Sequence, residues 1–174
     1  TTMNSARGVA VAGNFAYVAS LLADSLTVVD ISDPDNPVER GSVSNSTTMN
    51  SARGVAVAGN FAYVAASDAD SLTVVDISDP DNPMERGSVS TANMNDAHSV
   101  AVSGNFAYVA SLFADSLTVV DISDPDNPVE IDSITSSNLD GARGVAVTGP
   151  APGDFAYVAS QNADSLTAIE ITLP

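Results

Sequence analysis

Residues 23–37 read Ala-Asp-Ser-Leu-Thr-Val-Val-Asp-Ile-Ser-Asp-Pro-Asp-Asn-Pro. The same letters recur at residues 69–83 and at residues 114–128. A fourth copy begins at Ala163, where Ala168, Ile169 and Glu170 replace the usual residues, and the sequence ends at Pro174. Such close repetition indicates that one structural element is used several times.

The repeated stretch predicts a strand followed by a rigid turn. Residues 26–31 are rich in β-branched side chains and apolar on both faces, which is typical of a strand between two layers. Pro34 and Pro37 lack the N–H that a sheet ladder needs, so the strand ends before them. Asp33 and Asn36 each precede a proline and favour turns through side-chain to backbone hydrogen bonds.

A second motif sets the period. Ala-Arg-Gly-Val-Ala-Val begins at residues 6, 52 and 142, and the variant Ala-His-Ser-Val-Ala-Val begins at residue 97, which gives spacings of 46, 45 and 45. Periods of this length are typical of propellers and other repeat arrays. We therefore predict a single repeat domain over residues 1–174, with units at about 6–51, 52–96, 97–141 and 142–174.

Each unit contains four expected strands, at residues 8–12, 15–19, 26–31 and 38–44 in the first unit. The first is made of small residues, Gly13-Asn14 predicts a tight hairpin, and the last is polar and suits a solvated outer edge. The fourth unit has a longer hairpin at residues 149–154 and lacks the last strand. The fold class predicted is all-β, a β-propeller of four blades that is either a closed ring or an open arc forming half of a larger ring.

The motif Leu-Thr-Val-Val-Asp-Ile-Ser-Asp-Pro, with Ala-Arg-Gly-Val-Ala-Val upstream and Asn-Phe-Ala-Tyr-Val-Ala between them, resembles the LVIVD repeat family of propellers. The resemblance covers essentially the whole chain. It implies a bacterial or archaeal protein, commonly secreted or attached to the cell surface, whose function is poorly defined. It implies no catalytic residues, and family members usually have more than four units.

The composition limits the partners. The chain has 22 acidic residues, five basic residues that are all arginine, and a formal net charge of −17, so we expect no nucleic-acid partner. Acidity indicates either salty or calcium-rich surroundings or a surface that keeps a β-rich protein soluble, and we favour the second. Cysteine is absent, and no apolar stretch is long enough for a membrane helix, so we expect no membrane insertion. The first residue is Thr1, which indicates a processed form or a piece of a longer array.

The acidic turn is a candidate metal site. Asp30, Asp33, Asp35 and Asn36 resemble an oxygen-rich calcium loop, but their spacing is not that of an EF-hand, and the prolines stiffen the segment. We interpret the cluster as turn chemistry. We therefore expect no cofactor, with calcium as the alternative.

Basic residues recur at the start of the expected inner strands, near one mouth of a central channel, and these are Arg7, Arg53, His98 and Arg143. Two interpretations stay open: an anion-binding ring, or ion pairs with carboxylates that also recur, which are Asp30, Asp76, Asp121 and Glu170. We favour the ion pairs.

Catalysis built on the repeat is not expected, because His98 is the only histidine and a triad would need one in each unit. Tyrosine recurs once per unit, at Tyr17, Tyr63, Tyr108 and Tyr157, and we assign these side chains to the core. Asn45-Ser46-Thr47 matches a glycosylation sequon. We expect a non-enzyme, with a ligand-binding or hydrolytic propeller that uses the channel mouth as the alternative.

The incomplete fourth unit is the candidate interaction site. Its third strand should leave unpaired backbone groups that pair with another chain, which predicts a homo-oligomer or polymer. The predicted self-association edge consists of Leu166, Thr167, Ala168, Ile169, Glu170, Ile171 and Thr172. The expected role is that of a structural or interaction module at the cell exterior, with further protein partners open.

Overall fold

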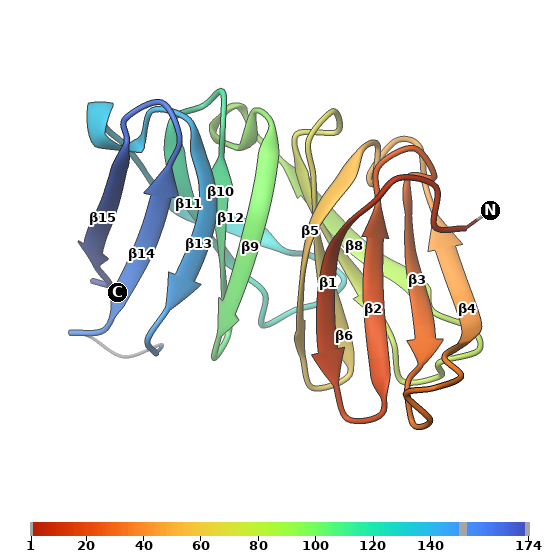
Figure 1. Cartoon of the computed structure of the whole chain (residues 1–174). Coiled ribbons are helices and arrows are strands. Elements are labelled where there is room, and N and C mark those ends of the chain that lie inside the picture. The colour runs from red at the N-terminus through yellow and green to blue at the C-terminus, as the bar shows by residue number, and fades with distance from the viewer. Residues whose placement is uncertain (1, 150–152, 173–174) are drawn as a thin grey trace.

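The computed structural model of the chain describes residues 2–149 and 153–172. Each repeat forms one antiparallel sheet, which we call a blade (Figure 1). In the first blade the strands lie in chain order, namely β1 (Ala6–Ala12), β2 (Phe15–Ser20), β3 (Ser25–Asp30) and β4 (Val38–Ser44). The four expected strands are confirmed, with bounds that shift by up to two residues.

The second and third blades repeat this order, and the fourth has three strands in the described residues. Their strands are β5 (Ala52–Ala58), β6 (Phe61–Ala66), β7 (Ser71–Asp76), β8 (Met84–Ser90), β9 (Ala97–Ser103), β10 (Phe106–Ser111), β11 (Ser116–Asp121), β12 (Val129–Thr135), β13 (Ala142–Val147), β14 (Phe155–Ser160) and β15 (Ser165–Glu170). Short 3-10 helices, η1 (Ala92–Met94) and η2 (Ser137–Leu139), lie between blades.

The hairpin between the first two strands of a blade follows from its glycine. Ala12 pairs with Phe15, so Gly13 and Asn14 alone make the turn. Gly13 has φ +57°, and Gly59 and Gly104 have the same value in the next two blades. A left-handed conformation suits glycine, which has no Cβ to clash. The predicted tight hairpin is confirmed there, whereas part of the longer loop at 149–154 lies outside the described residues.

The inner strands pack side by side in the order β1, β5, β9 and β13. Small residues make this possible: a Cβ on Gly54 would lie 2.9 Å from the His98 carbonyl oxygen and 2.9 Å from the Ser99 Cα. In the described residues no packing of similar extent joins β13 back to β1. The blades therefore form an open arc, and Figure 1 shows the first and fourth blades at its two ends.

Every blade is apolar on both faces. We call the face that packs on the following blade the forward face; in the first blade it contains Tyr17, Ala19, Leu26 and Val28. We call the opposite face, which packs on the preceding blade, the rear face. In the second blade the rear face contains Val55, Val57, Ala62, Val64, Val75 and Ile77.

The core consists of one apolar cluster at each junction between described blades, rather than a single centre. At each junction a side chain from the connecting segment fills the interior, and Met49, Met94 and Leu139 are all fully buried. This explains why both faces of the repeated strand are apolar, as the sequence predicted.

Replacing Gly54 by alanine tests the close approach of the inner strands. The new Cβ would meet the β9 backbone, so Gly54→Ala should lower the free energy of unfolding by about 1–3 kcal/mol. Gly144→Ala is the matched control, because the nearest atom to its Cβ is Ala159 Cβ at 3.7 Å. Urea unfolding of dilute protein measures the free energy of unfolding of both variants. Equal effects of the two substitutions would contradict the packing of β5 on β9.

Candidate functional site

Most of the residues predicted as a self-association edge belong to an edge strand of the fourth blade. Leu166 to Glu170 belong to β15, which in the described residues pairs with β14 alone, whereas β3, β7 and β11 each pair with strands on both sides. The set is divided between the two faces of the blade. Leu166, Ala168 and Glu170 are exposed, while Ile169 and Ile171 pack against the third blade.

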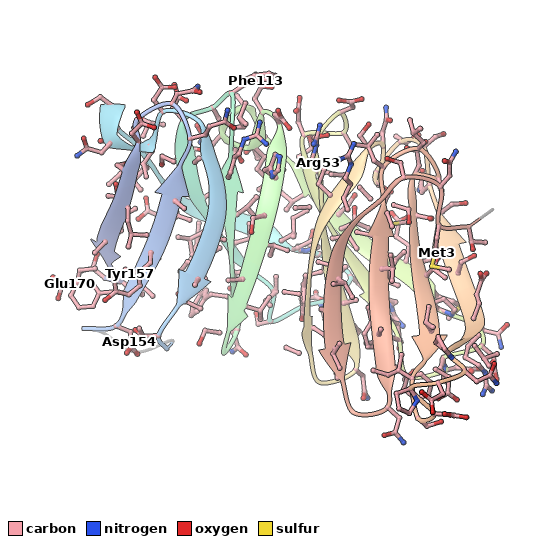
Figure 2. The ribbon with its side chains drawn as sticks, in the orientation of Figure 1. Met3, Arg53, Phe113, Asp154, Tyr157 and Glu170 are labelled. Carbon is pink, nitrogen blue, oxygen red and sulfur yellow. The ribbon has the colours of Figure 1, made fainter. Side chains whose placement is uncertain are left out.

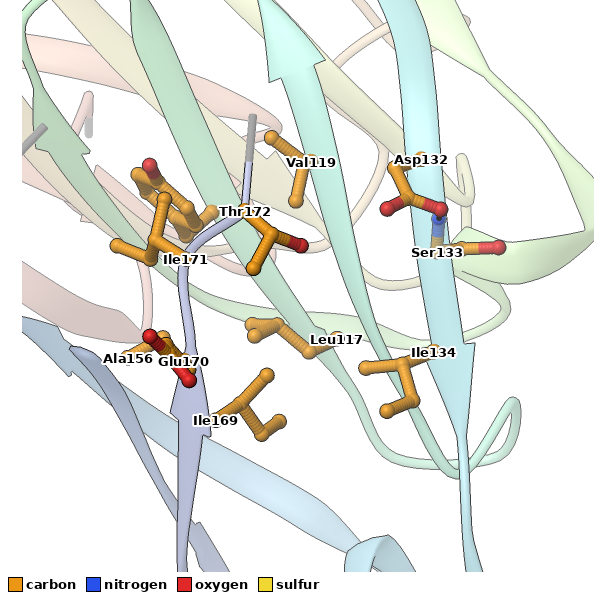
Figure 3. Close-up of a pocket in the computed structure, with 11 residues that line it drawn as sticks. Leu117, Val119, Asp132, Ser133, Ile134, Ala156, Ile169, Glu170, Ile171 and Thr172 are labelled. Carbon is orange, nitrogen blue, oxygen red and sulfur yellow. Dashed lines mark hydrogen bonds between the residues drawn. The ribbon is translucent and has the colours of Figure 1, made fainter. Parts of the chain in front are cut away.

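A cavity of about 130 Å³ lies beneath this edge, between the third and fourth blades. Figure 3 shows Leu117 and Val119 of β11, Ile134 of β12 and Ile169 of β15 around it. Tyr108 also lines it, and its buried hydroxyl has no hydrogen-bond partner. Burial is the main cause that raises the pKa of this phenol. The junction is therefore less completely filled where the fourth blade has no described outer strand.

The forward face of the fourth blade is uncovered. Leu166 is 71% exposed, whereas the equivalent Leu26, Leu72 and Leu117 are 0%, 0% and 2% exposed. Tyr157 is 37% exposed, against 4%, 4% and 1% for Tyr17, Tyr63 and Tyr108. The prediction that the recurring tyrosines are core residues is thus confirmed in three blades and wrong for Tyr157, because no blade follows it in the structure.

The rear face of the first blade is also uncovered. Val9 and Val11 are 65% and 62% exposed, and Met3 is 37% exposed although the equivalent Met49 is fully buried. Figure 2 shows Met3 and Tyr157 at opposite ends of the arc. Sequence reasoning did not identify this surface. The signal was present in the alignment of Met3 with Met49, Met94 and Leu139.

Polar clasps join the outer strand of one blade to the acidic turn of the next. A β-bulge leaves Arg40 between Val28 and Val29 of the neighbouring strand, and such bulges redirect a side chain. Arg40 donates from Nε to Asp81 Oδ1 at 2.7 Å and from a terminal nitrogen to Asp81 Oδ2 at 2.9 Å. Arg86 binds Asp126 in the same way, at 2.8 and 2.9 Å. Bidentate pairs of this kind fix geometry as well as charge.

The turn aspartates are occupied by these bonds and by their own backbone. The Arg86 guanidinium holds the pKa of Asp126 below its ordinary value, and Arg40 does the same for Asp81. The Asp33 carboxylate accepts from the Asp35 N–H at 3.1 Å, which is the turn chemistry expected from the sequence. Across residues 2–149 and 153–172, no group of three or more metal-ligating side chains is found.

The third blade departs from this pattern. Ile131 and Asp132 stand where the earlier blades have Arg40-Gly41 and Arg86-Gly87. In the fourth repeat, Thr172 and Leu173 stand at the positions of Ser32 and Asp33. The third blade therefore lacks the arginine that forms the clasp in the first two blades.

The basic residues of the inner strands lie around a hollow of about 370 Å³, lined by Arg7, Arg53, His98 and Arg143. Arg143 Nη1 lies 3.4 Å from His98 Nε2, and Arg53 donates from Nε to Ser67 Oγ at 2.8 Å. Burial, together with the charges of Arg53 and Arg143, lowers the pKa of His98. Arg53 and Phe113 lie at the same rim of the blades, near the middle of the arc (Figure 2).

The favoured pairing of these arginines with the recurring carboxylates is wrong. Asp30 and Asp76 lie 3.4 and 3.6 Å from the outer-strand residues Arg40 and Arg86 instead. Arg53 Nε is 3.8 Å from Asp96, a carboxylate that the sequence reasoning did not consider. Among the described residues, neither Arg7 nor Arg143 has a carboxylate within ion-pair distance.

The sequon asparagine is engaged in the fold. Asn45 Nδ2 donates to Glu85 Oε2 at 2.9 Å, and its Oδ1 accepts from the Thr47 N–H at 2.9 Å. A glycan on this nitrogen would displace the bond to the second blade.

The repeat pattern matches a known family model four times, at residues 4–45, 50–91, 95–136 and 141–171, under the description LVIVD repeat. The chain belongs to the LVIVD repeat family. This confirms the resemblance seen in the repeated motif. No curated protein matches the chain in sequence.

Solved structures share the arrangement of blades at low sequence identity. Hydrazine synthase of Kuenenia stuttgartiensis is 20% identical with a TM-score of 0.69, and the match covers 98% of this chain and 50% of that one. The periplasmic gluconolactonase PpgL of Pseudomonas aeruginosa is 17% identical with a TM-score of 0.75, over 94% of this chain and 49% of that one. The computationally designed Ika4 protein is 13% identical with a TM-score of 0.68, over 97% and 92%.

These likenesses support the β-propeller fold and no more. This LVIVD-repeat chain spans about half the length of the two natural proteins. Within the described residues, no helix has the length and apolar character required to cross a membrane.

Neutralising Asp126 tests the clasp. Because its folded pKa is depressed, its contribution to stability is present above the unfolded pKa near 4 and is lost as pH falls through the folded pKa. Asp126→Asn should lower Tm at pH 7 by roughly one to three degrees, and the difference should vanish in acid. The control is Asp35→Asn, the equivalent turn position, which has no described arginine partner. An equal decrease in Tm for both variants at pH 7 would contradict the clasp.

Proposed function

We propose that this chain is a non-catalytic structural or interaction module that associates with itself through its fourth blade. The observation that carries the proposal is the 71% exposure of Leu166, a position that is buried in the other three blades. A leucine left in water on a flat sheet next to exposed Tyr157 is an apolar surface of the kind that binds proteins. The edge of β15 adds unpaired backbone groups to the same region.

The non-catalytic assignment rests on the chemistry that the repeat supplies. The chain has one histidine for four blades and no cysteine, so a nucleophile paired with a general base is not repeated in each blade. The gluconolactonase likeness is a likeness of fold at 17% identity. It carries no residue of a hydrolytic site to this chain.

We place the module outside the cell or on its surface. The family resemblance is the support for this, and the net charge of −17 is compatible with it. Partners other than the chain itself are compatible with the same surface.

The mass in solution tests self-association. At physiological salt and high micromolar concentration, light scattering should give at least twice the chain mass of 17.6 kDa. Leu166→Asp should weaken association by at least about tenfold, because burial of a leucine is worth about 1.5–3 kcal/mol. Phe113→Asp is the control, since Phe113 is 70% exposed on a loop of the third blade. A monomer under these conditions would refute the proposal.

A second candidate is anion binding at the channel mouth. Arg7 and Arg143 have no described carboxylate partner, and together with Arg53 and His98 they surround one hollow in a chain whose net charge is −17. Positive charges gathered around one hollow repel one another, so a bound carboxylate or phosphate would relieve this repulsion. Guanidinium groups match such oxyanions well.

The single histidine reports on this site. Bound phosphate favours the charged imidazole, so the His98 pKa measured by NMR should rise when phosphate replaces chloride at equal ionic strength. Arg143→Gln should reduce that increase. Arg86→Gln, on an outer strand, should keep it. If phosphate leaves the His98 titration unchanged in the wild type, the mouth does not bind anions.

A further inference from the structure

We infer that a second copy of this chain docks head to tail, so that the forward face of the fourth blade packs on the rear face of the first blade of its partner. This inference rests on the proposed self-association and names its surfaces. The sequence alone favoured the backbone edge of β15. The side-chain exposures point instead to two sheet faces at opposite ends of the arc.

The internal junctions show what such a contact looks like. Between the first and second blades, Tyr17, Leu26 and Val28 of the forward face pack with Val64 and Val75 of the rear face. Met49 closes the same cluster and is fully buried there. The other junctions between described blades pair a forward face with a rear face in the same way.

Each end of the arc carries one half of this junction. The fourth blade presents Tyr157, Ala159 and Leu166, which are identical to Tyr17, Ala19 and Leu26, and only Ala168 differs from Val28. The rear face of the first blade consists of Val9, Val11, Ala16, Val18, Val29 and Ile31, identical to the residues of the second blade that cover Tyr17. Because the two end faces carry the residues that pack on each other at an internal junction, the faces are complementary to each other.

The segment before β1 already has its junction conformation. Ser25 Oγ donates to the Thr2 carbonyl at 2.6 Å, as Ser71 Oγ donates to the Thr48 carbonyl at 2.6 Å. Ser5 and Ser51 also share a positive φ, at 57° and 58°. Met3 is therefore held as Met49 is, but without a preceding blade to cover it. Docking therefore requires little further loss of conformational entropy in this segment, because it is already ordered.

The chemistry favours a second copy in this orientation over a symmetric contact. A symmetric pair would place Leu166 against Leu166, forward face on forward face, and none of the junctions between described blades is of that type. A head-to-tail pair uses the same contact twice if the rotation between the two chains closes, and otherwise the contact continues to a third chain. The two natural structures above are about twice as long as this chain, which fits as half of each.

The docked junction would lack the arginine clasp, because the fourth blade has no described outer strand to carry one. Each chain also brings a net charge of −17. Association should therefore be reversible and stronger at 0.15 M salt than at low salt, where charge repulsion reaches further. Internal junctions would remain the stronger ones.

Cysteine cross-linking tests the orientation, because the chain has no cysteine of its own. We would mix the single variants Met3→Cys and Leu166→Cys at physiological salt and add a short bismaleimide. The mixture should give a product of two chains, and neither variant should give one alone. The double variant Leu26→Cys/Met49→Cys in one chain, treated during refolding because both positions are fully buried, verifies that the reagent spans the equivalent internal pair. A mixture of Phe113→Cys with Leu166→Cys measures random collision, because Phe113 is 70% exposed on the third blade, away from both ends of the arc.

The outcomes are distinct. A product from Leu166→Cys alone would show the symmetric contact of two forward faces and overturn the head-to-tail inference while self-association stands. No mixed product, with a positive internal pair and a mass above one chain, would overturn it in the same way. A monomer mass with no mixed product would refute both proposals.

Gly144→Ala gives a second test without chemical modification. The equivalent Gly54 and Gly8 each lie against the inner strand of the following blade, whereas Gly144 has open space ahead of it. Gly144→Ala should leave the dilute monomer stable and weaken association at least about fivefold. An unchanged dissociation constant would contradict close approach of β13 to the β1 of a partner.

Discussion

The structure depends on sheets that are apolar on both faces. A strand such as β7, with Leu72 and Val74 on one face and Val75 on the other, must be covered on both sides. No blade does this by itself, so each completes the core of its neighbours, and the fold is a stack rather than a shell around one centre. The same requirement leaves the outer faces of the end blades with leucine, valine and tyrosine in contact with water.

Two local devices set how the blades are spaced. On the inside, glycine at positions 8 and 54 allows adjacent inner strands to approach without a Cβ between them. On the outside, the bulged residues Arg40 and Arg86 reach the acidic turn of the next blade. Small inner strands in every blade, and clasped outer strands in the first two, favour a wedge shape that curves the stack into an arc. Because the copies are nearly identical, each wedge is nearly the same.

The basic mouth and the uncovered faces are different kinds of surface. The mouth contains three of the five arginines and the only histidine. It is therefore a locally positive region on a chain whose net charge is negative. The faces are apolar and match a surface of the same repeat pattern. An anion would bind at the mouth, and a partner chain would bind on the faces. The two binding regions share residues only in the inner strands.

The sequence by itself determined the strands, the hairpins and the period, because these depend on local chemistry: β-branched runs, Gly13-Asn14 and the two prolines of each acidic turn. It also predicted that the strand at Leu166 lies at the edge of its sheet in the described residues, since no further strand of the repeat follows it there. Only the tertiary structure decided which carboxylate each arginine meets, because Arg40 and Asp81 are joined across a junction by a bulge that local sequence does not specify. It likewise decided that Tyr157 is exposed while its identical counterparts are buried, because burial depends on whether another blade lies against that face and not on the residue itself.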